Sequence, residues 1–192
     1  SIPDCYWVYK NPPAAMEALR CRDLPFPACT DWAPAMIISI HFYHMVGFRL
    51  DANDLFHHAL FVPCIGLIRF LYPWGVAGNM LCFFISGFPG GVSYFLLAAV
   101  IAGKIAPMTE KRINCSINTW IRGPGITFFC TVIFMCWSFP SEETLESDIL
   151  PWYSFFPACI VVFFNGQYYA QRVIGNYYIK KAQECGKRGE TI

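Results

Sequence analysis

The stretch Asp51–Val62, which reads DANDLFHHALFV, opens an apolar segment that carries two adjacent histidines. This segment continues to Tyr72 and is mostly Leu, Phe, Ile and Val, so as a helix from Asp54 it roughly spans a bilayer. His57 and His58 then lie about one turn inside one end of the span. Polar groups are costly inside a membrane and usually face a bundle interior or a water-filled cavity. The pair therefore indicates either a chemical or ligand site or hydrogen bonds between helices.

The composition predicts a membrane protein. Of 192 residues, 56% are hydrophobic and only 14% are charged, and several apolar runs approach the length of a bilayer span. The net charge is +1 and no basic stripe lies outside the C-terminal tail, which excludes nucleic acid as a partner. Most of the ten cysteines lie in apolar segments, where they act as small packing residues. Cys21 and Cys29 lie in a polar stretch and can form a disulfide if that end faces an oxidising compartment.

These runs predict an all-α fold, a polytopic transmembrane helical bundle of about five spans. The run 74–106 is interrupted by Ser86-Gly87-Phe88-Pro89-Gly90-Gly91. We expect one long, broken helix there, with its unwound middle beside the histidines; two short re-entrant halves are the alternative and give six spans. The other expected spans are Trp32 to Phe48, Asp54 to Tyr72, Ile113 to Phe139 with a kink at Gly123-Pro124-Gly125, and a last one beginning at Leu150.

Three regions follow from this pattern. Residues 1–30 form a polar N-terminal arm, irregular or lying on the surface, with a short helix at Ala14 to Leu19. Residues 31–181 form the transmembrane bundle, and residues 182–192 form a basic C-terminal tail. Because the chain begins with Ser1, we expect processing or an upstream segment.

The first two spans bring the four histidines together. His41 and His44 are three residues apart and share a helix face. The short polar turn from Arg49 to Asn53 joins this helix to the His57-His58 helix in an antiparallel hairpin, with all four rings in the half nearest the turn. Asp54 is expected to cap the second helix. Histidines of this kind can hold zinc or haem, but no cysteine or carboxylate set at suitable spacing joins them, so we predict no metal and no other cofactor.

A second polar group lies in the last span. Asn165, Tyr169, Arg172 and Asn176 are spaced by four, three and four residues, which places them along one helix face. Arg172 either points into the bundle or snorkels to the membrane interface.

The order of these features resembles the TLC-domain family, which includes ceramide synthases, the translocation-associated membrane protein and lipid-homeostasis proteins. The resemblance covers roughly residues 24 to 181 and rests on Asp54-Leu55-Phe56-His57-His58, the helix broken by Ser and Pro, and the ending Asn165 to Ile174. It implies a helical bundle that encloses a cavity for an acyl chain or lipid, in the endoplasmic reticulum by analogy or in another organellar membrane. His57 and His58 match the paired histidines that ceramide synthases use in acyl transfer from acyl-CoA. The expected cavity-lining residues are His41, His44, Ser86, Asn165, Tyr169 and Arg172.

Acidic residues that are typical of the family are missing here, and their absence decides which functions we consider. The span before the histidine pair has Tyr43-His44 where the family often has an acidic residue, and the broken helix has Ser86-Gly87-Phe88-Pro89 where it often has Glu. Acyl transfer needs a base and a group that orients it, so whether the chain is an enzyme stays open. One hypothesis is a lipid-handling protein whose partners are membrane lipids. The alternative is a non-catalytic accessory subunit of a large membrane complex, whose partners are other membrane subunits.

The charged loops predict the orientation in the membrane. The basic loop from Lys104 to Arg112 and the C-terminal tail face the cytoplasm or its equivalent, and the acidic loop from Pro140 to Asp148 faces away. Cysteine labelling or protease protection should place Lys111 and Lys187 on one side and Glu143 on the other. Glycosylation of Asn114, in Asn114-Cys115-Ser116, would contradict this orientation.

Overall fold

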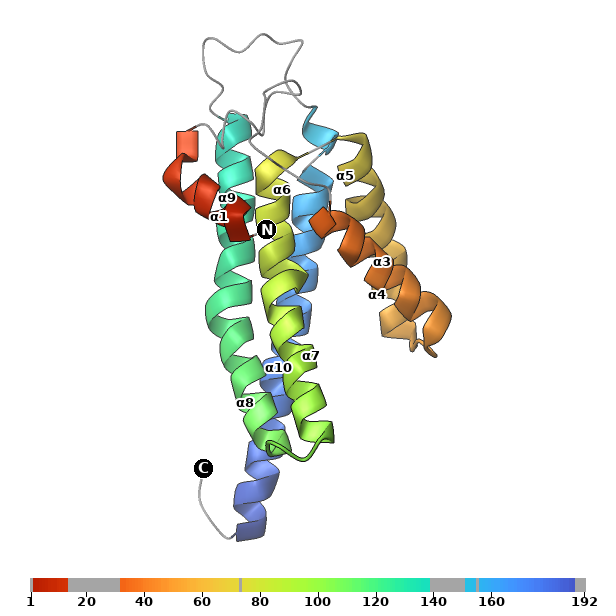
Figure 1. Ribbon diagram of the computed structural model, residues 1–192, viewed down its shortest axis with the longest axis vertical. Helices are drawn as coiled ribbons and strands as arrows, with labels where there is room; N and C mark the ends of the chain where they lie inside the picture. Colours follow the sequence, from red (N-terminus) through yellow and green to blue (C-terminus); the bar gives the residue numbers. More distant parts are fainter. Residues whose placement is uncertain (1, 14–31, 73, 139–150, 155, 189–192) are drawn as a thin grey trace.

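A computed structural model describes residues 2–13, 32–72, 74–138, 151–154 and 156–188 (Figure 1). These residues form helices and short turns, with no strand among them, so the all-α prediction is confirmed. The predicted helix at Ala14 to Leu19, the cysteine pair Cys21 and Cys29, and the acidic loop lie outside the described residues.

The described helices follow the expected spans closely. A short helix, α1, precedes five long, continuous helical segments within the described residues, and a 3₁₀ turn, η5, introduces the last of them. The bounds are α1 Ile2–Lys10; α3 Trp32–Gly47; α4 Ala52–Phe61, η1 Val62–Leu67 and α5 Ile68–Leu71; α6 Gly75–Cys82, η2 Phe83–Gly87 and α7 Phe88–Ile101; α8 Pro107–Ile117, η3 Asn118–Arg122 and α9 Gly123–Ser138; η5 Trp152–Ser154; and α10 Phe156–Arg188.

Of the two forms expected for the N-terminal arm, the irregular one is wrong for residues 2–10, which form the helix α1 on the surface of the bundle. This helix lies against α6, and Val8 is only 6% exposed. Cys5 and Trp7 pack against the same core. The apolar side chains of α1 therefore hold this part of the arm against the bundle. The prolines and charged residues nearby in the sequence gave no indication of this contact.

Three π-helical segments, η1, η2 and η3, lie inside three of the long helices. Segments η2 and η3 lie in the turn before Pro89 and Pro124, and η1 contains Pro63 near its start. Proline lacks a backbone N–H and crowds the preceding turn. Segment η2 overlaps the interruption predicted at 86–91, and η3 ends directly before the one predicted at 123–125. The predicted unwinding is wrong, because a π turn accommodates the proline while keeping most backbone groups hydrogen-bonded, as apolar surroundings require.

Two helices begin earlier than the sequence suggested. Asp51, not Asp54, caps α4, since its Oδ1 accepts a hydrogen bond of 2.8 Å from the Asp54 backbone N–H. Helix α8 begins at Pro107, a residue that suits the first turn of a helix. Lys111 and Arg112 are therefore helical rather than part of a loop.

The best-buried element is α6, in which every residue from Gly75 to Leu81 is buried. It contacts α1, α3 and α9. Two glycines let neighbouring helices approach closely. A Cβ on Gly125 of α9 would overlap the ring of Phe84 in η2, and one on Gly166 of α10 would lie 2.6 Å from Ile126 Cδ1.

Among the described helices, the segment Gly75–Ile101 is long and apolar enough to cross a membrane. Only 11% of its most apolar window is buried inside the protein, whereas the core helix of a soluble protein would be mostly covered. This supports association with a membrane. Figure 1 places the turn after α7 and the C-terminal end of α10 at the same end of the bundle, as the predicted basic side requires.

Replacing Gly125 by alanine should destabilise the protein by about 1 to 3 kcal/mol, because the new methyl group overlaps the Phe84 ring. Thermal unfolding in detergent measures the change. Gly90→Ala in α7 is the matched control, since a Cβ there meets nothing within 4 Å. Equal effects of the two substitutions would contradict the close packing of α9 on η2.

Candidate functional site

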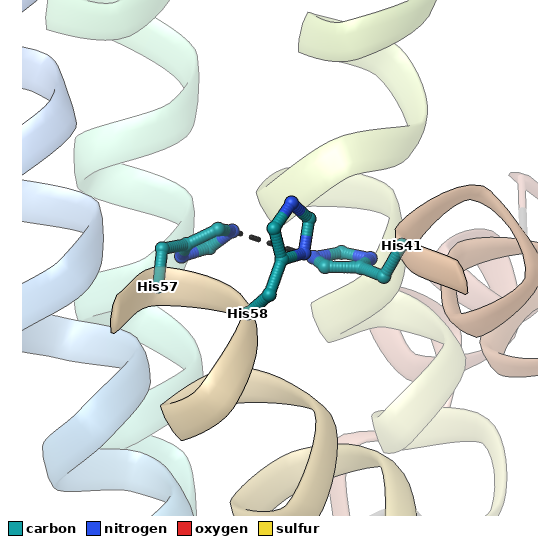
Figure 2. A group of neighbouring side chains, drawn as sticks. All are labelled: His41, His57 and His58. Carbon is teal, nitrogen blue, oxygen red and sulfur yellow. Dashed lines mark hydrogen bonds between the residues drawn. The ribbon is translucent and has the colours of Figure 1, made fainter. Parts of the chain in front are cut away.

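The α3–α4 hairpin brings three histidine rings into one cluster, formed by His41 of α3 and His57 and His58 of α4 (Figure 2). The centroid of the His41 ring lies 5.4 Å from that of His57 and 5.0 Å from that of His58. The Nε2 atoms of His41 and His57 are 3.3 Å apart. We call these three residues the histidine cluster.

His41 is held in one orientation by its own helix. Its Nδ1–H donates a hydrogen bond of 2.7 Å to the carbonyl oxygen of Ile37, one turn earlier. Its ring stacks on Phe61, with centroids 5.2 Å apart and planes 3° from parallel. A carbonyl oxygen only accepts hydrogen bonds, so Nδ1 carries the proton and Nε2 of the neutral ring is an acceptor.

His57 is oriented by the last helix, α10. Its Nδ1–H donates to Asn165 Oδ1 at 3.0 Å, and the Tyr169 ring meets the imidazole edge-on at a centroid distance of 5.1 Å. Of the face predicted on the last span, Asn165 and Tyr169 therefore lie beside the histidine cluster. Nε2 of His57 is again the acceptor nitrogen.

His58 is the most buried of the three, with 5% of its surface exposed. Its Nδ1 is buried and has no hydrogen-bond partner among the described residues. A buried, unpaired nitrogen usually has a cost of about 1 to 3 kcal/mol and calls for an explanation.

Of the other predicted lining residues, His44 lies at the edge of the cluster, and Arg172 and Ser86 lie apart from it. His44 is bonded through Nε2 to the Tyr94 hydroxyl at 3.1 Å, and its ring centroid is 6.0 Å from that of His58. Arg172 is exposed and packs its guanidinium over the rings of Tyr168 and Tyr169. Ser86 lies in η2, where its neighbour Ile85, rather than Ser86, lines the adjoining groove.

An apolar groove begins at His41 and runs between α3, the α4–η1 segment and the α6–η2 segment. It is partly open to its surroundings, and its enclosed volume is about 30 Å³. Except for His41, the residues that line this groove were not predicted from the sequence. Apolar side chains form no recognisable motif, and only the packing of the helices shows which of them face the same space. The lining residues are Pro34, Ile37, Ile38, His41, Phe61, Val62, Ile65, Gly66, Trp74, Gly78, Leu81, Cys82 and Ile85.

A second polar network joins α7 to α8. Ser93 Oγ donates to Asn114 Oδ1 at 2.8 Å, and Asn114 Nδ2 donates to Glu110 Oε1 at 2.6 Å. These bonds give the buried Asn114 side chain partners within the protein, so the tripeptide that begins there is poorly placed as a glycosylation acceptor. The network has the character of a structural link between helices.

Comparisons with protein-family models, with curated protein sequences and with solved structures find no match to this chain. The resemblance to the TLC-domain family therefore rests on the sequence features quoted above.

The bond between His57 and Asn165 should contribute about 0.6 kcal/mol, and at most about 1.7 kcal/mol, to stability, the range measured for bonds between membrane helices. A double-mutant cycle of His57→Ala and Asn165→Ala isolates this coupling. Thermal unfolding is measured with a chelator present, so that no bound ion contributes. Asn176→Ala, at an exposed position on the same helix, is the control. A coupling of zero would show that the two side chains do not interact.

Proposed function

We propose that this chain is a TLC-like integral membrane protein that binds a lipid or fatty acyl chain in the apolar groove, with the polar end of the ligand at the histidine cluster. One observation carries the proposal. The walls of the groove are almost wholly apolar, and the imidazole of His41 lies among them. An amphiphile with a long hydrocarbon tail and a small polar head has the complementary character.

The position of the groove supports this proposal. Pockets for small molecules often lie between the helices of a bundle. The helix that forms one wall also has the apolar, exposed surface expected of a membrane span. A lipid in the bilayer would then reach the groove without crossing water.

The surroundings of the histidines favour binding over acyl transfer. Acyl transfer needs a general base and a second group that makes this base stronger. A carboxylate usually acts as the second group. Here the partners of His41 and His57 are a backbone carbonyl and a side-chain amide. These direct partners orient the rings but carry no charge themselves, so we propose lipid binding as the function.

Filling the groove should displace the lipid. Ile85→Trp adds a large side chain inside the groove, and we expect lipid that copurifies in mild detergent to fall several-fold. Mass spectrometry of the extracted protein measures the amount of lipid per chain. Leu97→Trp is the matched control, since it adds the same ring to an exposed position of the same long helix.

Equal lipid content in both variants and the unsubstituted protein would refute the groove as the binding site. The accessory-subunit alternative gives a further distinguishable result. In that case the protein purifies inside a large assembly, and Ile85→Trp changes neither lipid content nor assembly.

A further inference from the structure

The hydrogen bonds of the histidine cluster leave two lone pairs facing each other. Ile37 and Asn165 fix the proton on Nδ1 of His41 and of His57. The two Nε2 atoms, 3.3 Å apart, are then both acceptors when the rings are neutral. Two acceptors at this distance repel each other, so the arrangement favours a positive charge between them.

A shared proton or a metal ion can supply that charge. A shared proton satisfies two nitrogens and leaves His58 unexplained, although its buried Nδ1 has no partner among the described residues. A metal ion uses a third nitrogen as well. The ligand nitrogens of all three rings lie within 4.8 Å of one another, so a metal ion accounts for the cluster as a whole.

We infer that His41, His57 and His58 bind a divalent transition-metal ion, most simply Zn²⁺, with a fourth position open toward the groove. Zinc lies about 2.0 to 2.1 Å from histidine nitrogens, so two ligands of a tetrahedral site are about 3.3 to 3.4 Å apart. The Nε2 atoms of His41 and His57 already have this separation. The ligand nitrogen of His58 lies within 4.8 Å of those of His41 and His57, so it has to move closer to them to complete the site.

The surroundings of the cluster match those of known zinc sites. Histidines that bind metals usually donate their second ring N–H to a carbonyl or carboxylate, which fixes the ring and its tautomer. The Ile37 carbonyl and the Asn165 amide have this role here. Asp54 lies three and four residues before His57 and His58 on the same helix, so its carboxylate adds negative charge near a buried cation.

This site departs from the sequence prediction of no metal. His41 and the pair His57-His58 belong to two helices, and their spacing matches no familiar metal motif. Only the antiparallel packing of the hairpin shows that they converge. Three imidazoles without a thiolate suit Zn²⁺, Cu²⁺, Fe²⁺ or Ni²⁺ by ligand type, and the tetrahedral spacing favours Zn²⁺ among them.

The experiment uses the full chain in detergent, stripped with EDTA and then titrated with Zn²⁺ against a chelator of known affinity. We expect one Zn²⁺ per chain, and loss of this binding in His41→Ala, His57→Ala and His58→Ala. His44→Ala is the matched control, because His44 is bonded to Tyr94 and lies outside the cluster. Titration with Co²⁺ should give the strong visible absorption of a four-coordinate site.

A variant that keeps all three histidines tests the site even if the histidine variants fail to fold. Asn165→Ala should weaken Zn²⁺ binding about 10- to 100-fold, the usual effect of removing a group that orients a ligand, while Asn176→Ala should not change it. Failure to bind Zn²⁺, or equal binding by the His41→Ala and His44→Ala variants, would overturn the inference and leave a shared proton between His41 and His57. Ile85→Trp should retain Zn²⁺, so failure of the lipid proposal and failure of the metal proposal can be told apart.

Discussion

The packing of α6 is the constraint on which the rest of the bundle depends. Its residues Gly75 to Leu81 are all buried, and the helix contacts α1, α3 and α9. Gly75, Ala77 and Gly78 are small and buried, which lets neighbouring helices approach α6 closely. The same helix forms one wall of the groove through Gly78, Leu81 and Cys82, and the candidate site is therefore built on the best-buried element of the fold.

The π segments connect this packing to the site. Each contains or closely precedes a proline within a long helix, where a regular α-helix would lose a hydrogen bond. A π turn also inserts a residue into the helix and shifts the face that the following residues present. In the second long helix, η1 begins at Val62, directly after the turn that carries His57 and His58. In the third, η2 places Ile85 in the groove. The prolines thus help to decide which apolar side chains face the ligand.

The features that the sequence predicted correctly are those with a local signal. The long apolar runs predicted the helices, and the glycines and prolines predicted roughly where these helices are interrupted. The short turn before Asp54 predicted that the histidines of the first two spans lie close together. The features it missed depend on contacts between distant residues. The packing of α1 on α6 and the walls of the groove are examples. The spacing of polar residues predicted the helix face that contains Asn165. The hydrogen bond from His57 to Asn165 joins residues 108 positions apart, and no local sequence pattern predicts a partner at that distance.

The geometry of the cluster also bears on the resemblance to acyltransferases. A histidine that acts as a base or nucleophile needs a free lone pair directed at its substrate. The lone pair of His57 Nε2 instead faces Nε2 of His41, and its Nδ1–H is held by an amide rather than by a carboxylate. A metal ion in the cluster would occupy this same lone pair, so metal binding and direct acyl transfer by His57 exclude each other. The ring partners of His41 and His57, a backbone carbonyl and a side-chain amide, suit an imidazole that is held in place better than one that reacts.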